Sequence, residues 1–215
     1  TLFYIMLKYA SNKYDYTIFA CYDILSLFLY RSSNKVVLID HNNIGQLDNW
    51  LKLKLTCLYN EYKHVCLSQY MCDRLSELIP SHCIEHVPHG LVVPVENITE
   101  PDYLHEDEQF IFCPVNSNFN HSYVSSILND KTISLFLENN KIIMYIKPID
   151  GITPSESIKI ITGRIPENEY NFLIKNATAV VLPYTIEFKY RCSGIFFECV
   201  ANDVPMICLK NHTIS

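Results

Sequence analysis

The residues best suited to chemistry lie at a loop-to-helix junction near the C-terminus. Ser193 is a good N-cap for a short helix that continues to about Ala201. At the start of such a helix, the backbone N–H groups of Gly194, Ile195 and Phe196 have no acceptor inside the helix. A helix start of this kind favours a phosphate or a diphosphate, and glycine, with no side chain, lets the ligand approach the backbone closely.

Charged residues flank this predicted helix start. Lys189 and Arg191 precede it and supply positive charge for a phosphate. Glu198 lies just over one turn into the helix, where its carboxylate could accept hydrogen bonds from paired sugar hydroxyls. In the alternative interpretation, Arg191 and Glu198 pair with each other and Gly194 only permits a tight turn. The local residues leave both interpretations open.

A strand–loop–helix–strand unit positions these residues. An apolar run, Val180–Pro183, precedes the loop, and a second apolar run, Met206–Leu209, follows the helix. Such units belong to parallel sheets covered by helices on both sides. Strands and helices alternate through the rest of the chain: predicted strands cover 16–20, 35–39, 64–68, 109–114, 141–146, 158–162 and 179–182, and predicted helices cover 4–12, 22–30, 50–62, 69–79 and 167–176. The predicted fold class is α/β with parallel sheets.

Composition narrows the possible functions. The chain has 215 residues, 49% of them hydrophobic, and a formal net charge of −6, which argues against broad nucleic-acid binding. Its nine cysteines include no C-x-x-C pair, a pattern typical of a reducing cytosol. A zinc site is disfavoured because the paired ligand spacing is missing from the patch of His64, Cys66, Cys72, His82, Cys83, His86 and His89. Both ends look like those of a piece of a longer protein.

The segment Tyr184–Pro205 resembles the donor-binding segment of GT-B fold glycosyltransferases of the retaining family 4 type. The matching pattern is Tyr-x5-Tyr-Arg-x-Ser-Gly-x3-Glu-x2-Ala-x3-Pro. The resemblance implies that the helix start holds the diphosphate of a nucleotide-sugar and that Glu198 binds ribose or sugar hydroxyls. Tyr190 stands where most members have a second glutamate, so the sequence is similar to a Tyr-Arg-x-Ser-Gly variant.

Other short segments resemble the same family in the same order. Ile39–Asn42 is similar to a strand end whose histidine faces the cleft, which makes His41 a catalytic-site candidate, although an ordinary loop histidine is the alternative. Ile84–Gly90 resembles a strand and turn in which His89 replaces an asparagine, and we expect a positive φ at Gly90. Gly163–Glu169 matches the family's Gly-x-Ile-Pro-x-x-Glu. The resemblance implies a cleft role for Arg164, and a surface arginine is the alternative.

The resemblance predicts two Rossmann-like domains that face a cleft, both incomplete. Residues 1–97 would form the acceptor-side domain, 98–108 a linker and 109–215 the donor-binding domain. The segment Glu96–Glu108 holds six acidic residues and no lysine or arginine, as expected for a solvated linker.

The predicted function is transfer of a sugar from a nucleotide-sugar, such as a UDP- or GDP-sugar, to a hydroxyl of a glycan, a lipid-linked acceptor or a small molecule. The resemblance implies a retaining, metal-independent reaction that needs no cofactor. Catalysis is assigned to His41, Arg191 and Glu198, and donor binding to Arg164, Lys189, Tyr190, Ser193, Gly194 and Ile195. The alternatives are a non-catalytic GT-B module that binds nucleotide-sugar or glycan, and a GT-B sugar-nucleotide epimerase.

The predicted location is the cytoplasm, which the cysteine pattern favours. No uncharged apolar run is long enough to span a membrane. The predicted helix at 50–62 carries Lys52 and Lys54 among apolar residues. A solvated helix face is one interpretation, and a peripheral contact with anionic lipid at the inner face of the membrane is the other.

Overall fold

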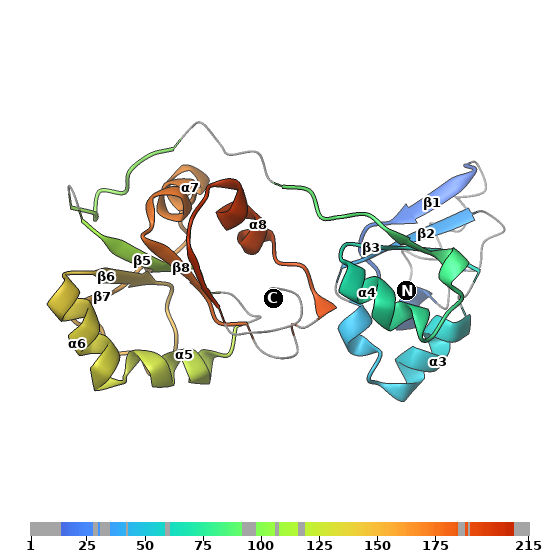
Figure 1. Ribbon diagram of the computed structural model, residues 1–215, viewed down its shortest axis with the longest axis horizontal. Coiled ribbons are helices and arrows are strands. Elements are labelled where there is room, and N and C mark those ends of the chain that lie inside the picture. The colour runs from blue at the N-terminus through green and yellow to red at the C-terminus, as the bar shows by residue number, and fades with distance from the viewer. Residues whose placement is uncertain are drawn as a thin grey trace.

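The computed structural model describes residues 14–27, 30, 35–41, 43–58, 61–91, 98–105, 108–115, 119–184, 188 and 190–208. They form two parallel sheets with helices around them (Figure 1). The first sheet unit contains β1 (Tyr16–Phe19), α2 (Ile24–Leu27), β2 (Lys35–Asp40), η1 (Ile44–Gln46), α3 (Trp50–Leu58), β3 (Lys63–Cys66), α4 (Gln69–Ser76), η2 (Ser81–Cys83) and β4 (Ile84–His86). The second contains β5 (Phe110–Cys113), α5 (His121–Leu128), α6 (Lys131–Asn140), β6 (Ile143–Ile146), β7 (Ile158–Ile160), α7 (Glu167–Asn176), β8 (Ala179–Leu182), α8 (Gly194–Ala201) and β9 (Met206–Cys208).

The first sheet has the order β1-β2-β3-β4, and every pairing in it is parallel. The register pairs Asp40 with Cys66 and Cys66 with His86, so three neighbouring strands end side by side. The pairing continues past β4, where the N–H of His89 donates to the carbonyl of Leu67 at 3.3 Å. The residues that follow these strands therefore emerge at one edge, which is where ligands bind in open parallel sheets.

The second sheet has the order β7-β6-β5-β8-β9 and is also entirely parallel. Helices α5 and α6 cover one face and α7 and α8 the other (Figure 1). The central strand β5 is buried at all four positions, as expected for a strand with helices on both faces. The α/β fold with parallel sheets that the sequence predicts is confirmed.

Three elements agree with their predicted bounds, and two helices were not predicted. Helices α7 and α8 and strand β8 span the residues expected from the sequence. Helices α5 and α6 were missed, although each has a side-chain N-cap: Asn120 accepts from the N–H of Tyr123, and Asp130 from that of Thr132. Because both helices are short, their caps were the best local signal for them.

Two helices are shorter than expected from the sequence, and the positive φ expected at Gly90 was wrong. The helix expected at 22–30 is described only over 24–27, and the helix expected at 50–62 ends at Leu58. Gly90 does not adopt a positive φ; the described glycines that do are Gly151 and Gly163. The chain beyond β4 instead stays hydrogen-bonded to the end of β3 and needs no left-handed turn there. The helix expected at 4–12 lies outside the described residues.

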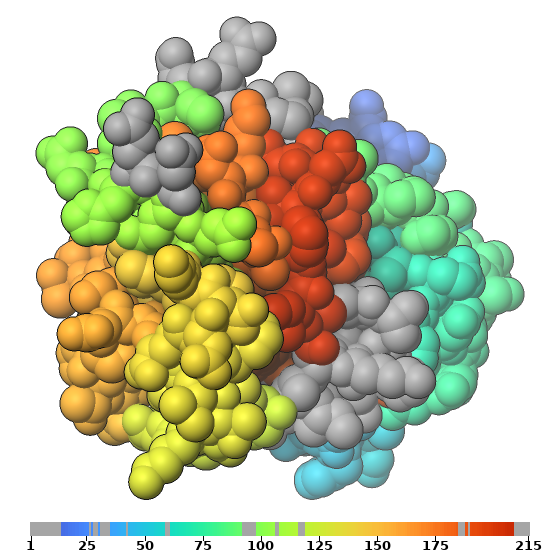
Figure 2. All heavy atoms as spheres, turned by 60° about the vertical axis from the view of Figure 1, so that its left-hand side comes forward, coloured from blue at the N-terminus to red at the C-terminus, as the bar shows by residue number. Residues whose placement is uncertain are grey.

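The two sheet units meet through the loop before α8. Tyr190 and Cys192 belong to the chain segment of the second unit but are buried in the hydrophobic core of the first. The ring of Tyr190 stacks on Tyr70 of α4, with centroids 5.1 Å apart and planes 11° apart. Figure 2 shows the red atoms of the α8 region lying between the yellow-green atoms of the second unit and the teal atoms of the first. The loop before α8 thus fixes this helix against the first unit.

The division at residues 97 and 108 stays a prediction, and the change from one sheet to the other falls between β4 and β5. Among the described residues, none of the helices has both the length and the apolar character needed to cross a membrane.

Candidate functional site

The start of α8 has the cap that the sequence predicts. Ser193 has an extended backbone (φ −100°, ψ 119°), and its Oγ accepts the N–H of Phe196 at 3.1 Å. The Tyr184 hydroxyl also forms a hydrogen bond with this Oγ, which is buried. The Phe196 N–H is therefore satisfied inside the protein. The groups of the first turn that can face a ligand are those of Gly194, which is exposed, and Ile195.

Replacing Ser193 by alanine should lower the free energy of unfolding by about 1 kcal/mol, because the helix loses its N-cap acceptor. Urea unfolding would show a lower midpoint at an unchanged slope. Ser126→Ala on the exposed face of α5 is the matched control, since its hydroxyl only donates to the Tyr123 carbonyl. An equal loss in both variants would contradict the capping role.

Glu198 points back along α8 toward the helix start. A Cβ added at Gly194 would lie 4.0 Å from the Glu198 Oε1 atom, so the carboxylate and the first turn share one place. The Tyr170 hydroxyl of α7 donates to the other carboxylate oxygen at 3.2 Å. Burial raises the pKa of Glu198, and the hydrogen bond from Tyr170 partly offsets this rise. Tyr170 was not predicted as a site residue, because no local sequence signal connects α7 with α8.

Tyr170 also lines a pocket of about 230 Å³ at the carboxyl ends of β5, β6 and β7. Its lining residues are Phe112, Pro114, Val115, Lys147, Arg164, Ile165 and Tyr170. The positive φ of Gly163 (75°) turns the chain just before Arg164, and the ammonium group of Lys147 donates to the Gly163 carbonyl. Arg164 thus lines this pocket, and its role in binding stays a prediction. Lys147 was missed, although its place directly after β6 was a usable signal.

The described residues just before α8 differ in their exposure to solvent. Arg191 is half-buried, its N–H donates to the Phe188 carbonyl at 3.0 Å, and its guanidinium lies 6.0 Å from the centre of the Phe188 ring. Tyr190 is only 8% exposed and packs on Tyr70, so its ring joins the two units. Lys189 lies outside the described residues.

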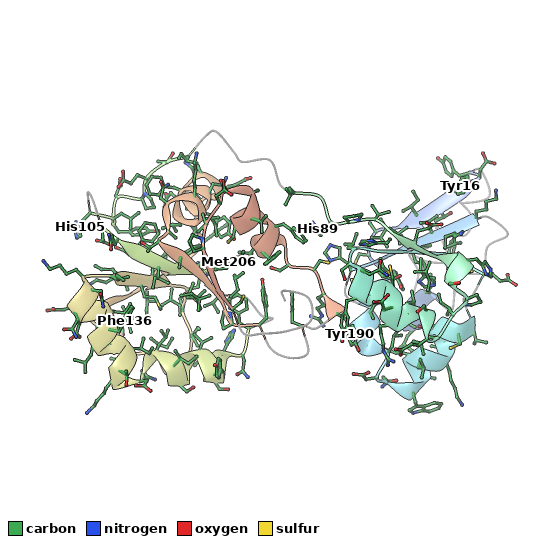
Figure 3. All side chains as sticks on the ribbon, in the orientation of Figure 1. Tyr16, His89, His105, Phe136, Tyr190 and Met206 are labelled. Atoms are coloured by element: carbon green, nitrogen blue, oxygen red, sulfur yellow. The ribbon has the colours of Figure 1, made fainter. Side chains whose placement is uncertain are left out.

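His41 follows β2 on the first unit and is half-buried. Its ring lies edge-on to that of His89, with centroids 6.0 Å apart, and His89 stacks on Phe197 of α8 at 4.3 Å. Burial and the nearby His89 lower the pKa of His41. Figure 3 shows His89 and Tyr190 at the junction of the two units. The structure therefore brings His41 and α8 to the same junction, and the catalytic role of His41 stays a prediction.

A buried polar group lies directly behind His41. Asp40 is 1% exposed and accepts a hydrogen bond from the Tyr22 hydroxyl on one oxygen. Its other oxygen lies 2.9 Å from the Nδ1 atom of His64, which is also 1% exposed. Burial and the negative charge of Asp40 raise the pKa of Tyr22 well above its usual value. This group holds the end of β2, from which His41 extends.

Replacing Asp40 by alanine should lower the free energy of unfolding by about 3 kcal/mol, because it leaves two buried donors without an acceptor. The thermal midpoint of the variant measures this loss. Asp73→Ala on the exposed face of α4 is the control, and we expect less than about 0.5 kcal/mol there. A similar small effect at both positions would mean that the buried group contributes little to stability.

Two further observations concern other kinds of site. Among the described residues, no group of three or more His, Cys, Asp or Glu side chains is arranged to hold a metal ion. A cavity of about 380 Å³ lies elsewhere, over β6 and β7, with Tyr103, His105, Glu156 and Lys159 in its lining. His105 marks the outer end of the second unit, far from the junction (Figure 3). That cavity is therefore separate from the α8 site.

Comparison with solved structures gives several matches over most of the chain. UDP-GlcNAc 2-epimerase from Methanocaldococcus jannaschii matches with a TM-score of 0.58 and 16% identity, over 96% of this chain and 64% of that one. The S. aureus MnaA-UDP structure matches with a TM-score of 0.54 and 14% identity, over 96% and 60%. The lipopolysaccharide outer core galactosyltransferase WaaB matches with a TM-score of 0.51 and 14% identity, over 96% and 59%.

The chain thus spans less than two thirds of the length of these proteins. No protein-family model and no curated protein sequence matches it. The matching structures share two parallel α/β units with this chain at low sequence identity, which is a likeness of fold. The chain therefore has the GT-B fold, which sugar-nucleotide epimerases and glycosyltransferases share.

Proposed function

We propose that this protein is a glycosyltransferase that binds a nucleotide-sugar on its second unit and transfers the sugar to a hydroxyl acceptor. The observation that carries the proposal is the shared position of the exposed Gly194 helix start and the Glu198 carboxylate. One end of this arrangement suits a diphosphate and the other suits sugar hydroxyls. The pocket with Lys147 and Arg164 adjoins it through Tyr170.

The donor would lie across these groups. Its diphosphate would accept hydrogen bonds from the N–H groups of Gly194 and Ile195, beside the guanidinium of Arg191. Ribose or sugar hydroxyls would donate to Glu198. The nucleoside would extend toward the pocket of Lys147 and Arg164 at the strand ends. Two of the matching structures carry a UDP compound in their names, which supports UDP as the first nucleotide to test.

The proposed reaction retains the anomeric configuration and needs no metal ion or cofactor. As the bond between sugar and diphosphate breaks, negative charge grows on the leaving phosphate. The helix start and Arg191 would stabilise this charge in place, which is the usual large contribution of a preorganised site. His41 would line the reacting cleft from the first unit. Because its pKa is lowered, the ring would be neutral at pH 7 and able to bind or polarise a hydroxyl.

The proposed acceptor is a glycan, a lipid-linked acceptor or a small molecule, and the proposed location is the cytoplasm. Helix α3 supports a peripheral contact with anionic lipid. Trp50 and Leu58 are both 65% exposed, and the ammonium of Lys54 lies 5.0 Å from the centre of a Trp50 ring. An exposed indole beside a lysine suits the interface between lipid headgroups and water.

A second candidate function is epimerisation of the nucleotide-sugar itself. The epimerase from Methanocaldococcus jannaschii gives the higher TM-score, 0.58, against 0.51 for the galactosyltransferase. A non-catalytic module that binds nucleotide-sugar or glycan is the third candidate. It is favoured by Tyr190, which is packed against Tyr70 where most family 4 members would offer a glutamate.

One assay separates the three candidates. The full natural chain would be incubated with UDP-GlcNAc, UDP-glucose and GDP-mannose, with and without hydroxyl acceptors, and followed by NMR. A transferase releases UDP or GDP and forms a glycoside of unchanged anomeric configuration. An epimerase converts the donor without releasing nucleotide, and a binding module leaves every donor intact. Donor conversion without an acceptor and without nucleotide release would refute the transfer proposal.

A further inference from the structure

His89, which stands where the resembling family has asparagine, joins the two units at the candidate site. It follows β4 of the first unit, and its backbone N–H donates to the Leu67 carbonyl at 3.3 Å, so its position is fixed to the end of β3. Its ring stacks on Phe197 of α8 with centroids 4.3 Å apart and planes 4° apart. The contact thus connects the strand ends of one unit with the helix of the other.

The tautomer of the His89 ring follows from its hydrogen bond. The Nδ1 atom lies 2.8 Å from the Gly90 carbonyl oxygen, which can only accept. Nδ1 must therefore carry the hydrogen, and in the neutral ring Nε2 holds the lone pair. The hydrogen bond also fixes the ring plane, so the orientation of the stack is set from the first unit.

The stacked residue belongs to the first turn of α8. The Phe197 N–H donates to the Ser193 carbonyl at 3.3 Å, and Phe197 directly precedes Glu198. Phe196 supports the same ring, with centroids 5.3 Å apart and planes 86° apart. A shift of Phe197 would therefore move the helix start and the carboxylate together.

His41 lies on another side of the same imidazole. Its ring centroid is 6.0 Å from that of His89, and the planes are 75° apart. His89 is thus in contact with the candidate catalytic histidine and with the helix proposed to hold the donor. Both contacts depend on a ring: an asparagine side chain could keep the hydrogen bond to Gly90 but could not stack on Phe197.

We propose that His89 is a positioning residue, which holds the first turn of α8 and the ring of His41 at a fixed separation across the junction. The inference rests on the proposed function, because the separation matters for transfer between donor and acceptor. Such a residue acts on kcat: the donor still binds on the second unit, but its reacting end is misplaced. Misplacement of about 1 Å can lower a rate by as much as about 10²-fold.

Two substitutions separate the ring from its hydrogen bond. His89→Phe keeps a flat ring on Phe197, whereas His89→Asn keeps an amide donor for the Gly90 carbonyl and loses the stack. We expect kcat to fall about tenfold or more in His89→Asn and clearly less in His89→Phe, with the KM for the donor changed by less than about threefold. His82→Asn is the control. His82 is exposed and lies before β4, at the amino ends of the strands, whereas His89 follows their carboxyl ends.

NMR on the ligand-free protein supplies the second measurement. The Phe197 ring protons should move on loss of the stack in His89→Asn and stay near their wild-type shifts in His89→Phe. The pKa of His41 should rise in both variants, because the electrostatic effect of His89, which lowers it, is lost. Unchanged Phe197 and His41 resonances, or a wild-type kcat, in His89→Asn would overturn the inference. Failure of the proposed function would instead appear as absence of nucleotide binding and turnover in the wild-type protein, while the resonances still decide the role of His89.

Discussion

Replacing Arg191 by alanine is expected to lower kcat for sugar transfer by about 10²–10³-fold, the usual cost of losing one donor that stabilises developing negative charge. The guanidinium stands two residues before the N-cap Ser193, so it would meet the same phosphate as the helix start. The N–H of Arg191 donates to Phe188 through the backbone, and the substitution leaves this hydrogen bond in place. The variant should therefore fold, and the loss should appear in turnover.

Arg191→Lys is the matched variant. It keeps the positive charge but lacks the planar fork that can hold two phosphate oxygens, so a fall of about tenfold is expected, smaller than in the alanine variant. Steady-state kinetics with the preferred donor, with melting temperatures as a check of folding, would measure both. Wild-type turnover in a folded Arg191→Ala protein would remove this residue from the mechanism.

Replacing Glu198 by glutamine should weaken binding of the nucleotide-sugar by about 10–100-fold, since charged acceptors form the stronger hydrogen bonds with hydroxyls. The substitution should not lower the stability of the protein and should raise it slightly. The pKa of Glu198 is raised above its usual value, so the folded state pays a cost for ionising this carboxyl at pH 7. Glutamine has the same shape and no charge, and its side-chain oxygen can still accept from Tyr170. The variant should therefore melt at the same temperature or slightly higher.

The pH dependence of binding follows from the same shift. A raised pKa means that the folded protein takes up this proton at higher pH than the unfolded chain. The destabilising effect of the ionised carboxylate is therefore complete above the folded pKa, declines as the pH falls below it, and is gone below the unfolded pKa. Ligand affinity should fall as the pH falls, because the protonated carboxyl is a poorer acceptor. Calorimetric titrations from pH 7 downward should show weakening that is absent in Glu198→Gln. Glu138→Gln on the exposed face of α6 is the control.

Local signals in the sequence were enough to predict α8 and its cap. Serine at the N-cap followed by glycine, and the break near Pro205, define a helix from contacts within a few residues, and the structure has these bounds. The same kind of signal at Asn120 and Asp130 was present but was not used for α5 and α6. The α/β class followed from the alternation of strands and helices.

The site contacts that were not predicted from the sequence join segments that lie far apart in the chain. Tyr170 reaches Glu198 from another helix, and Tyr190 stacks on Tyr70 across the two units. His89 was noticed only as a replacement for asparagine, because its partner Phe197 lies more than a hundred residues further along the chain. Neither hydrophobic periodicity nor a short motif predicts contacts between residues so far apart in the chain. The sequence thus predicted helix α8, and the structure added the residues that pack around it.

The most direct test of the donor site is the binding of UDP to the wild-type protein and to Gly194→Ala, followed by thermal shift. A Cβ at position 194 would meet only the Glu198 carboxylate, at an ordinary contact distance of 4.0 Å, so the variant should fold with unchanged or slightly higher stability. UDP at about 100 times its Kd should stabilise the wild-type protein by about 2.7 kcal/mol. We expect uridine to do much less and GDP and ADP to identify the preferred base. We expect the UDP shift to be largely lost in Gly194→Ala, because the methyl group keeps the diphosphate from the backbone. Equal UDP shifts in both proteins would contradict a diphosphate site at the start of α8.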